Sequence, residues 1–213
     1  MLDYDFETHD EMIELSGVAG EMLSMTVEKI ANLYLKNDKA WVIGFSGGKD
    51  STVVLSLIFQ ALTTLKKKQL TKNVYVVCSD TLVETPVVVG LIRETLNDVQ
   101  ECAKKKGIPL VTQIVVPEVG ETFWSNLLGK GYPAPTKSFR WCTERMKINP
   151  VSDFIQSTVS KHGEVIVALG SRSQESASRA QSIAKHAIKG SELARHSSLP
   201  NAFTYMPIEN WHV

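Results

Sequence analysis

Four short apolar runs alternate along the chain with longer segments in which apolar residues recur at helical spacing. The runs cover residues 40–45, 74–78, 110–116 and 164–169, each bounded by polar or turn-forming residues. Between them, apolar residues return every three or four positions over residues 50–65, 87–106 and 143–160. Short apolar runs are typical of strands buried on both faces, and the intervening periodicity is that of amphipathic helices. The alternation predicts an α/β fold, in which a parallel sheet has right-handed crossovers and helices on both faces.

Two further segments lie outside this alternation. Residues 10–36 carry apolar residues at helical spacing, so we expect an added N-terminal helical segment over residues 1–38 and one domain over residues 39–213. Residues 117–136 hold three glycines and three prolines, which predicts a long functional loop with a short helix near residues 123–128. A chain of 213 residues is long enough for one domain with an ordinary core.

Composition excludes several classes of protein. With 43% hydrophobic and 22% charged residues, the chain falls outside the collagen-like, disordered and disulfide-scaffold classes. The longest charge-free stretch, residues 51–65, is shorter than the roughly 20 apolar residues of a membrane span. Residues 1–28 hold eight carboxylates and no lysine or arginine, unlike the start of a secretory signal. We therefore expect a cytoplasmic protein without a membrane anchor.

Charge is balanced overall but uneven along the chain. The 23 basic and 23 acidic residues give a net charge of zero, which argues against a protein that coats nucleic acid. Residues 137–195, however, hold ten basic and five acidic side chains. This excess indicates a basic face that could meet phosphate, with scattered solvated charge as the alternative.

Cysteine and histidine spacing points to no complete metal site. Cys78, Cys102 and Cys142 are far apart and include no CxxC pair, so this chain alone can build neither a disulfide framework nor a zinc or iron–sulfur site. The five histidines show no ligand spacing, and none is assigned to a metal. Cys78, in a predicted strand, and Cys102, in a predicted helix, are interpreted as core or surface residues.

The first predicted strand and helix are joined by a glycine-rich loop with the chemistry of an anion site. Two glycines without Cβ atoms let backbone N–H groups approach a phosphate, and the helix N-terminus adds a positive dipole. Hydroxyl and ammonium donors complete the loop, which reads Ser46, Gly47, Gly48, Lys49, Asp50 and Ser51. Asp50 would repel phosphate unless it coordinates Mg²⁺ or caps the helix, and we expect one or both roles. The alternative is a plain glycine turn with an aspartate cap, and the string matches neither GxxxxGK[ST] nor GxGxxG.

The string SGGKDS resembles the signature of the PP-loop ATP pyrophosphatases, which include sulfonucleotide (PAPS) reductases, ATP sulfurylase small subunits and tRNA-thiolating enzymes. Two later strand ends are similar to the same family. Residues 79–86, SDTLVETP, resemble an Asp-Thr and Glu-Thr segment of the reductases, although Leu82 stands where reductases usually have glycine. Residues 170–180, GSRSQESASRA, resemble a segment with Arg, Glu-Ser and Arg.

This resemblance implies a Rossmann-like fold of the adenine nucleotide alpha hydrolase type. It also implies a catalytic role for Lys49, Asp50 and Arg172, with Asp50 as the magnesium ligand. The nucleotide-binding residues would be Ser46, Gly47, Gly48, Lys49, Asp50, Ser51, Asp80, Thr81, Glu175, Ser176 and Arg179. Physically, arginines supply rigid guanidinium forks for phosphate, which Glu175 could orient, and the alternative is a surface helix with an i,i+4 ion pair.

Residues 123–135 and 139–148 look like the DndC and SspD group of ATP-dependent sulfurtransferases of DNA phosphorothioation. Cys142 lies in the second of these segments, flanked by Arg140, Arg145 and Lys147. Nearby cations and a predicted helix start favour a thiolate, which suits a sulfur carrier or nucleophile. The alternatives are a buried inert cysteine and a ligand to an iron–sulfur cluster in a longer parent protein.

The resemblance implies ATP and Mg²⁺ as cofactors and cleavage of ATP into AMP and pyrophosphate. A DNA backbone phosphate would attack the α-phosphorus, and persulfide sulfur from a cysteine desulfurase would then displace AMP, with relay through Cys142. Other phosphorothioation proteins would be partners. The alternatives are a PAPS reductase-type sulfonucleotide enzyme, which would need a C-terminal cysteine that is not found before Val213, and a non-catalytic nucleotide-sensing scaffold.

Residues 206–213 resemble a family segment that continues into a further helix. We therefore expect the domain to be truncated at its C-terminal end. Members of this group are longer and carry more cysteines downstream, so an iron–sulfur cluster is expected only in a longer parent protein.

Overall fold

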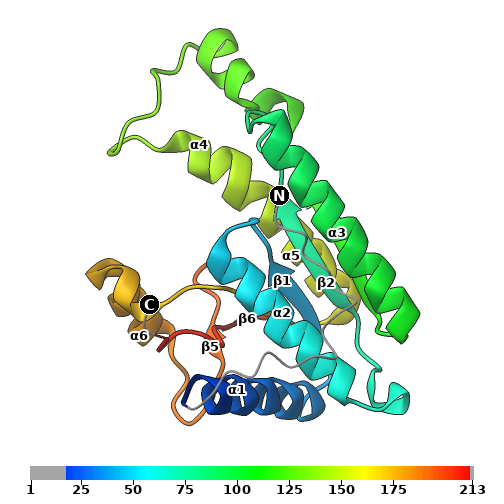
Figure 1. Cartoon of the computed structure of the whole chain (residues 1–213). Helices are drawn as coiled ribbons and strands as arrows, with labels where there is room; N and C mark the ends of the chain where they lie inside the picture. Colours follow the sequence, from blue (N-terminus) through cyan, green and yellow to red (C-terminus); the bar gives the residue numbers. More distant parts are fainter. Residues whose placement is uncertain (1–17, 212–213) are drawn as a thin grey trace.

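The fold is seen in a computed structural model that describes residues 18–211, apart from the side chains of Val18, Ala19 and Ser178. Its centre is a six-stranded sheet in the order β3-β2-β1-β4-β6-β5 (Figure 1). The strands are β1 (Ala40–Gly44), β2 (Val74–Ser79), β3 (Leu110–Val115), β4 (Val165–Ala168), β5 (Ala194–Arg195) and β6 (Ala202–Tyr205). All neighbours pair in parallel except β5 and β6, which are antiparallel. The predicted α/β fold is confirmed.

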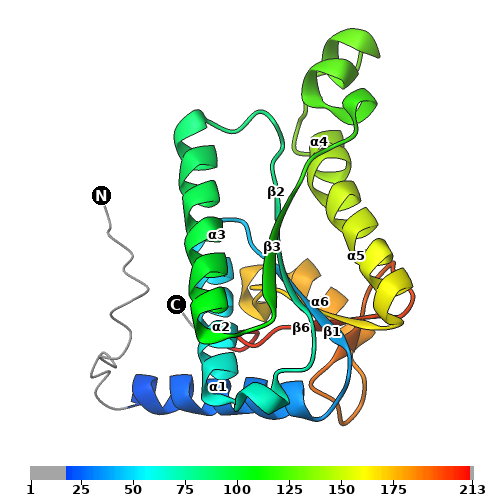
Figure 2. The ribbon, with the colours of Figure 1, turned by 90° about the vertical axis from the view of Figure 1, so that its right-hand side faces the viewer.

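Helices cover both faces of this sheet, as the alternation predicted. The α-helices are α1 (Val18–Leu35), α2 (Lys49–Thr64), α3 (Pro86–Lys106), α4 (Trp141–Thr143), α5 (Asn149–His162) and α6 (Ala177–His186). Helices α2 and α3 lie on one face and α5 on the other (Figure 2). No helix in residues 18–211 is both long and apolar enough to cross a membrane.

Alternate residues of β1 place their side chains in two separate hydrophobic cores. Trp41 and Ile43 point into the larger core, shared with α1, α2 and α3, whereas Val42 points into the smaller core under α5. All three side chains are essentially inaccessible to solvent. Each such burial contributes on the order of 1.5–3 kcal/mol, which explains why β1 forms the centre of the sheet.

Helix α1 is fixed to the domain through its last turns. Ile30 and Tyr34 are buried, and the Tyr34 ring lies 6.0 Å from that of Trp41. The Tyr34 hydroxyl also accepts a hydrogen bond from Lys72 N at 3.1 Å and donates one to Lys72 O at 3.2 Å. The expected N-terminal helix is thus confirmed over residues 18–35. Residues 10–17 of the expected helix, and all residues before them, lie outside the described part of the chain.

A projecting segment follows β3, and we call residues 117–140 the arm (Figure 1). It contains a 3₁₀ turn (Val119–Glu121) and a π-helical turn (Ser125–Gly129) where the sequence predicted a loop with a short helix. The predicted helix at 143–160 begins two residues earlier and is divided into α4, a π-helical turn (Glu144–Ile148) and α5.

Proline explains that division. Pro150 has no N–H with which to bond the carbonyl of Met146 four residues earlier, and its ring would clash with that carbonyl in a regular helix. The Met146 carbonyl instead accepts a 2.7 Å hydrogen bond from Ser79 Oγ, at the end of β2. The irregular turn therefore docks this helix on the carboxyl edge of the sheet.

Candidate functional site

Three chemically active segments meet at one edge of the sheet. They follow β1, β2 and β4, and β1 lies between the other two strands in the sheet. Because the three strands are parallel, their carboxyl ends share one edge, which is where α/β sheets bind ligands. The sheet order therefore brings together the segments at residues 46–51, 79–85 and 170–179.

The glycine loop after β1 is shaped by its own polar groups. Gly47 has a φ of +72°, a conformation that glycine adopts without strain, and Gly48 is the N-cap of α2. Ser51 Oγ donates to Gly48 O at 2.9 Å and accepts from Ser46 N at 3.2 Å, and Ser46 Oγ lies 3.1 Å from it. In this arrangement both hydroxyls hold the loop. The first N–H groups of α2 have no helical acceptors and remain for an anion.

Two glycines allow the loop to sit close to its neighbours. A Cβ on Gly47 would lie 3.2 Å from Ile92 Cγ1 in α3. A Cβ on Gly170, after β4, would lie 2.8 Å from the backbone C and O of Asp50. Real Cβ atoms do not approach backbone so closely, so only glycine fits at position 170 without displacing the start of α2.

Arg172 joins the loop after β4 to the glycine loop. Its Nη2 atom lies 3.3 Å from Asp50 Oδ2, and only 13% of its side chain is exposed, against 27% for Asp50. Arg172 Nε is buried without a hydrogen-bond partner in the described residues, since Glu175 Oε1 is 4.0 Å away. A guanidinium held beside an anion loop, with its Nη2 atom next to Asp50, is suited to binding an oxyanion.

Glu175 orients this segment, as the sequence suggested. Its Oε1 atom accepts a 3.2 Å hydrogen bond from Arg172 N, and its Oε2 atom pairs with Arg179. Ser176 is the N-cap of α6 and accepts from Arg179 N at 3.2 Å. The guanidinium of Arg179, whose side chain is 43% exposed, pairs with Glu175. This is the i,i+4 ion pair that the sequence left as the alternative. Lys49 extends from the first residue of α2 and is exposed.

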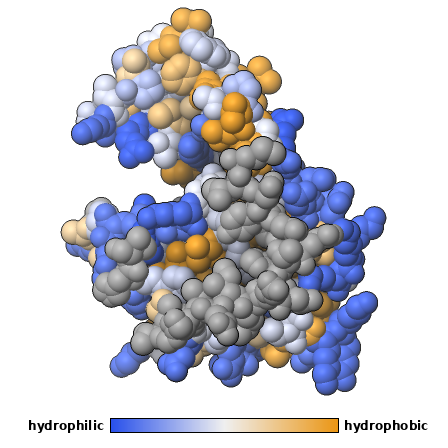
Figure 3. Space-filling view, viewed as in Figure 1, coloured by the Kyte–Doolittle hydropathy of each residue, from blue (hydrophilic) through white to orange (hydrophobic). Residues whose placement is uncertain are grey.

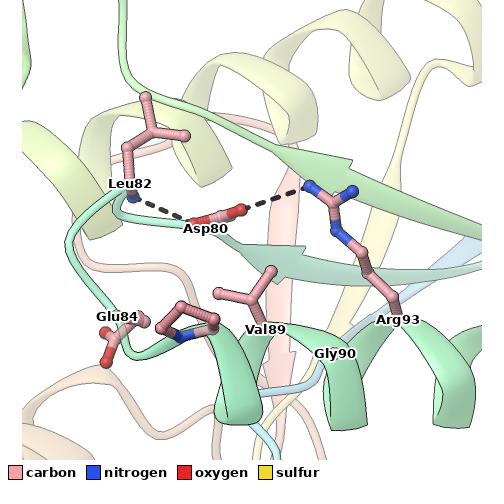
Figure 4. A pocket seen from close by; sticks show the side chains of 7 residues that line it. Asp80, Leu82, Glu84, Val89, Gly90 and Arg93 are labelled. Carbon is pink, nitrogen blue, oxygen red and sulfur yellow. Dashed lines mark hydrogen bonds and ion pairs between the residues drawn. The ribbon is translucent and has the colours of Figure 1, made fainter.

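The loop after β2 lies next to the glycine loop, but its polar side chains bond within the loop and to Arg93 of α3. Asp80 Oδ1 accepts from Leu82 N at 2.9 Å, and Oδ2 lies 3.6 Å from Arg93 Nη2 (Figure 4). Thr81 is 1% exposed and donates to Glu84 Oε1 at 3.2 Å, so its hydroxyl supports the loop. An open cavity of about 460 Å³ lies here, lined by Asp80, Leu82, Glu84, Pro86, Val89, Gly90 and Arg93.

The three cysteines have different environments. Cys78 is buried in β2, and burial, aided by the carboxylates of Asp80 and Glu84, raises the pKa of its thiol to about 11. This confirms Cys78 as a core residue. Cys142 is half-buried in α4, and Cys102 is half-buried in α3. Two of the three cations that flank Cys142 have other partners, because Arg145 binds Glu121 and Tyr132 and Lys147 lies 3.4 Å from Glu84.

One residue of this site has the chemistry of a magnesium ligand. Asp50, partly exposed beside the anion loop, fits Mg²⁺, which proteins often hold with one or two carboxylates plus substrate phosphates. Within residues 18–211 no three His, Cys, Asp or Glu side chains gather into a metal site. The described cysteines therefore do not fit an iron–sulfur cluster, and no step is assigned to one.

Two site residues escaped the sequence analysis. Arg93 pairs with Asp80 and is the one basic residue in residues 86–103. A single cation in an otherwise uncharged or acidic helix segment is the sequence feature that could have indicated it. Gly170 was noted only as a strand end. Its packing against Asp50 joins residues 120 positions apart, which no local pattern reveals.

Comparisons with known proteins show the family and the fold. A family model described as the phosphoadenosine phosphosulfate reductase domain matches residues 40–213. Two uncharacterised proteins of Methanocaldococcus jannaschii are similar. MJ0066 is 30% identical over 206 residues, covering 96% of this chain and 36% of the relative. MJ0973 is 31% identical over 135 residues, covering 63% of this chain and 26% of the relative. The chain thus spans about a third of the length of these relatives.

Two solved structures share the fold. The phosphoadenylyl-sulfate reductase of Candida auris, in a phosphate complex, has a TM-score of 0.51 at 13% identity and covers 93% of this chain and 83% of its own. The U34-tRNA thiolase NcsA of Methanococcus maripaludis, with its [4Fe-4S] cluster, has a TM-score of 0.52 at 16% identity and covers 91% and 61%. At these identities the likeness establishes the fold alone.

Proposed function

This chain belongs to the phosphoadenosine phosphosulfate reductase domain family, and from that premise we propose that it is the ATP pyrophosphatase domain of an ATP-dependent sulfurtransferase. The substrate would be DNA, whose backbone phosphate is activated for sulfur insertion. The single observation that carries the proposal is the meeting of the glycine loop and Arg172 at Asp50. This arrangement combines backbone donors, a helix N-terminus and a guanidinium around one space for phosphate.

In this proposal the residues act by binding and orientation. Gly47, Gly48 and the start of α2 hold the β- and γ-phosphates that leave as pyrophosphate. A DNA phosphate oxygen bonds to the α-phosphorus of ATP while the bond between the α-phosphorus and the bridging oxygen breaks. Arg172 neutralises the charge that develops on these oxygens, and Lys49 reaches the phosphates from the helix start. Positioning and charge neutralisation supply the catalysis.

Asp50 would hold Mg²⁺ together with phosphate oxygens. When bound, the metal would neutralise charge on the leaving pyrophosphate. Because Asp50 is paired with Arg172 in this structure, ligand binding would exchange that ion pair for one Asp50 contact with the metal and one Arg172 contact with phosphate.

Sulfur delivery belongs to the second half of the proposed reaction. A persulfide from a cysteine desulfurase would displace AMP from the activated DNA phosphate, with a P–S bond formed as the bond to AMP breaks. A second thiol would then cleave the S–S bond, leaving the phosphorothioate on the DNA and a disulfide on the sulfur carrier. Cys142 is the candidate relay, because it is the cysteine in the segment that resembles the DNA sulfurtransferases. Cys142→Ser should then abolish sulfur incorporation and leave ATP binding intact, since Cys142 is not part of the glycine loop.

A sulfonucleotide reductase is the second candidate, and the family model is the observation in its favour. It requires an accessible cysteine that attacks the sulfonucleotide. Consumption of PAPS with sulfite release, and no cleavage of ATP, would select it. A chain that binds ATP without cleaving either substrate would be a nucleotide-sensing scaffold.

The direct test is mass spectrometry of DNA for phosphorothioate dinucleotides, in cells carrying the intact gene of the parent protein or an Asp50→Ala variant. We expect phosphorothioates with the intact gene and none with Asp50→Ala. Asp98→Ala, which changes an exposed aspartate of α3, is the matched control and should keep the modification. Unmodified DNA from the intact gene, with its partner genes present, would contradict the proposal.

A further inference from the structure

Five aromatic rings form a continuous series through the arm and α4. Phe123 lies at 5.2 Å from Trp124 and stacks on Trp141 at 5.5 Å between ring centroids. Tyr132 continues the series, 5.8 Å from Trp141 and 6.4 Å from Phe139. The middle of the series is protected, with Trp141 only 5% exposed. Its two ends are open to solvent, since Trp124 is 58% and Phe139 is 45% exposed.

Cations accompany the exposed end at Phe139. Thr136 and Phe139 close a tight turn through reciprocal backbone hydrogen bonds of 3.2 and 3.3 Å, with Lys137 inside the turn and Arg140 directly after it. Both cations are exposed, and neither has a carboxylate within ion-pair distance among residues 18–211. An aromatic face between two uncommitted cations is complementary to a base and its neighbouring phosphates.

The arm is held in this form by polar contacts. Arg145 binds Glu121, donates to the Tyr132 hydroxyl at 2.9 Å, and lies 5.0 Å from the centroid of the Tyr132 ring. Trp141 Nε1 donates to Pro133 O at 3.0 Å. Binding to a segment that is already ordered loses less conformational entropy, so exposed rings at its surface can act as a fixed platform.

The arm also lies at the edge of the sheet where the candidate site is found. It follows β3, which is parallel to β2, so it leaves the sheet at the edge that carries the glycine loop. Ser79 and Glu84 fix its base there through Met146 and Lys147. In the space-filling view, hydrophobic side chains gather on the arm and a hollow separates it from the body of the molecule (Figure 3).

We propose that the arm is a stacking platform for single-stranded DNA, with Trp124 and Phe139 each stacking on an unpaired base and Lys137 and Arg140 contacting the adjacent phosphates. This inference rests on the proposed function, because it names the element that brings the DNA strand to the glycine loop. Unpaired bases are required, since the bases of a duplex are already stacked on one another. A purely apolar partner surface would leave both uncommitted cations without a role.

The test is the binding of fluorescein-labelled 20-nucleotide single-stranded DNA to the full chain, followed by fluorescence anisotropy. Trp124→Leu keeps an apolar side chain but removes the aromatic face, and we expect it to raise Kd about tenfold. Trp124→Phe should restore most of the affinity. Leu128→Ala is the matched control, because Leu128 is 74% exposed on the same arm and has no aromatic face, and it should leave Kd unchanged.

Salt dependence tests the cations separately. Lys137→Gln and Arg140→Gln should each reduce the slope of log Kd against log salt concentration by about 0.7, the value for one phosphate contact with a single strand. Unchanged slopes in both variants would remove the phosphate contacts from the proposal.

Several results would overturn the platform. These are equal weakening by Leu128→Ala and Trp124→Leu, which indicates an apolar protein-docking surface, or tighter binding of duplex DNA or of single-stranded RNA of the same length. Pyrophosphate release from ATP, measured on the same preparations with DNA present, separates the two proposals. If the chain cleaves ATP and its Kd for DNA does not change in Trp124→Leu, only the platform is refuted. Binding that depends on Trp124 in a chain that cleaves no ATP supports the platform and refutes the proposed function.

Discussion

Leu82 occupies a backbone position that favours glycine. Its φ is +62°, in the left-handed region, where an L-residue with a Cβ is strained by roughly 1–2 kcal/mol. Reductases of the family resemble this segment but usually have glycine there. The loop keeps its form because Asp80 Oδ1 accepts a hydrogen bond from Leu82 N.

Replacing Leu82 by glycine should therefore not destabilise the protein. Relief of the strain offsets the extra backbone entropy of glycine in the unfolded chain, about 0.5–1 kcal/mol, and Leu82 is 52% exposed. The adjacent Val83, 44% exposed and with negative φ, is the matched control. Val83→Gly should lower the free energy of unfolding by about 1 kcal/mol relative to Leu82→Gly in urea titrations. Equal losses in both variants would mean that Leu82 is not strained.

Cys78 makes stability depend on pH in the alkaline range. Its thiol pKa is raised to about 11 in the folded protein, from an ordinary value near 9. Between these values the folded state keeps a proton that the unfolded state has lost, so the free energy of unfolding falls as pH rises, by at most about 1.4 kcal/mol per pH unit. Urea titrations at pH 8 and pH 10 should show a smaller fall for Cys78→Ala than for the unchanged chain. Parallel curves for the two proteins would contradict this assignment.

At the scale of elements, the helix from α4 to α5 is positioned by one proline and one serine. Pro150 frees the Met146 carbonyl, the π-helical turn accommodates the ring, and Ser79 Oγ satisfies the carbonyl. The contact ties the base of the arm to the end of β2. It therefore couples two elements that both border the candidate site.

Ser79→Ala should lower the free energy of unfolding by about 1–2 kcal/mol, because it leaves the Met146 carbonyl without its partner. Ser157 is the matched control. Its Oγ also donates to a helical carbonyl, that of Phe154 at 2.7 Å, but at an exposed position. Ser157→Ala should change stability by less than about 0.5 kcal/mol in the same thermal or urea measurement. A similar loss in both variants would show that the Ser79 contact has no special role.

Across the whole molecule, the sequence predicted those helices and strands whose burial shows as a repeat of apolar residues over a few positions. Strands β1 to β4 and helices α2 and α3 were recognised because their apolar residues repeat over a few positions. β4 and β6 both have four residues, but β4 is entirely apolar, whereas Thr204 interrupts β6. β6 was therefore missed, because it forms through pairing with β4, from Val165 and Ala202 onward. The glycine loop was predicted from its string, whereas the pairing of Asp50 with Arg172, 122 residues later, was not, because only the folded sheet makes them neighbours.

We propose that this site cleaves ATP between its α- and β-phosphates. The most direct measurement is the identity of the products when the full chain, single-stranded DNA, Mg²⁺ and ATP labelled at the α- and γ-phosphates are combined. We expect equal amounts of pyrophosphate and of AMP bound to the DNA, loss of both in Asp50→Ala, and strong reduction in Arg172→Lys, because one ammonium cannot replace a guanidinium fork. Addition of a persulfide donor should then release the bound AMP. ADP with orthophosphate as the products, or unchanged turnover in both variants, would contradict cleavage of ATP between the α- and β-phosphates at this site.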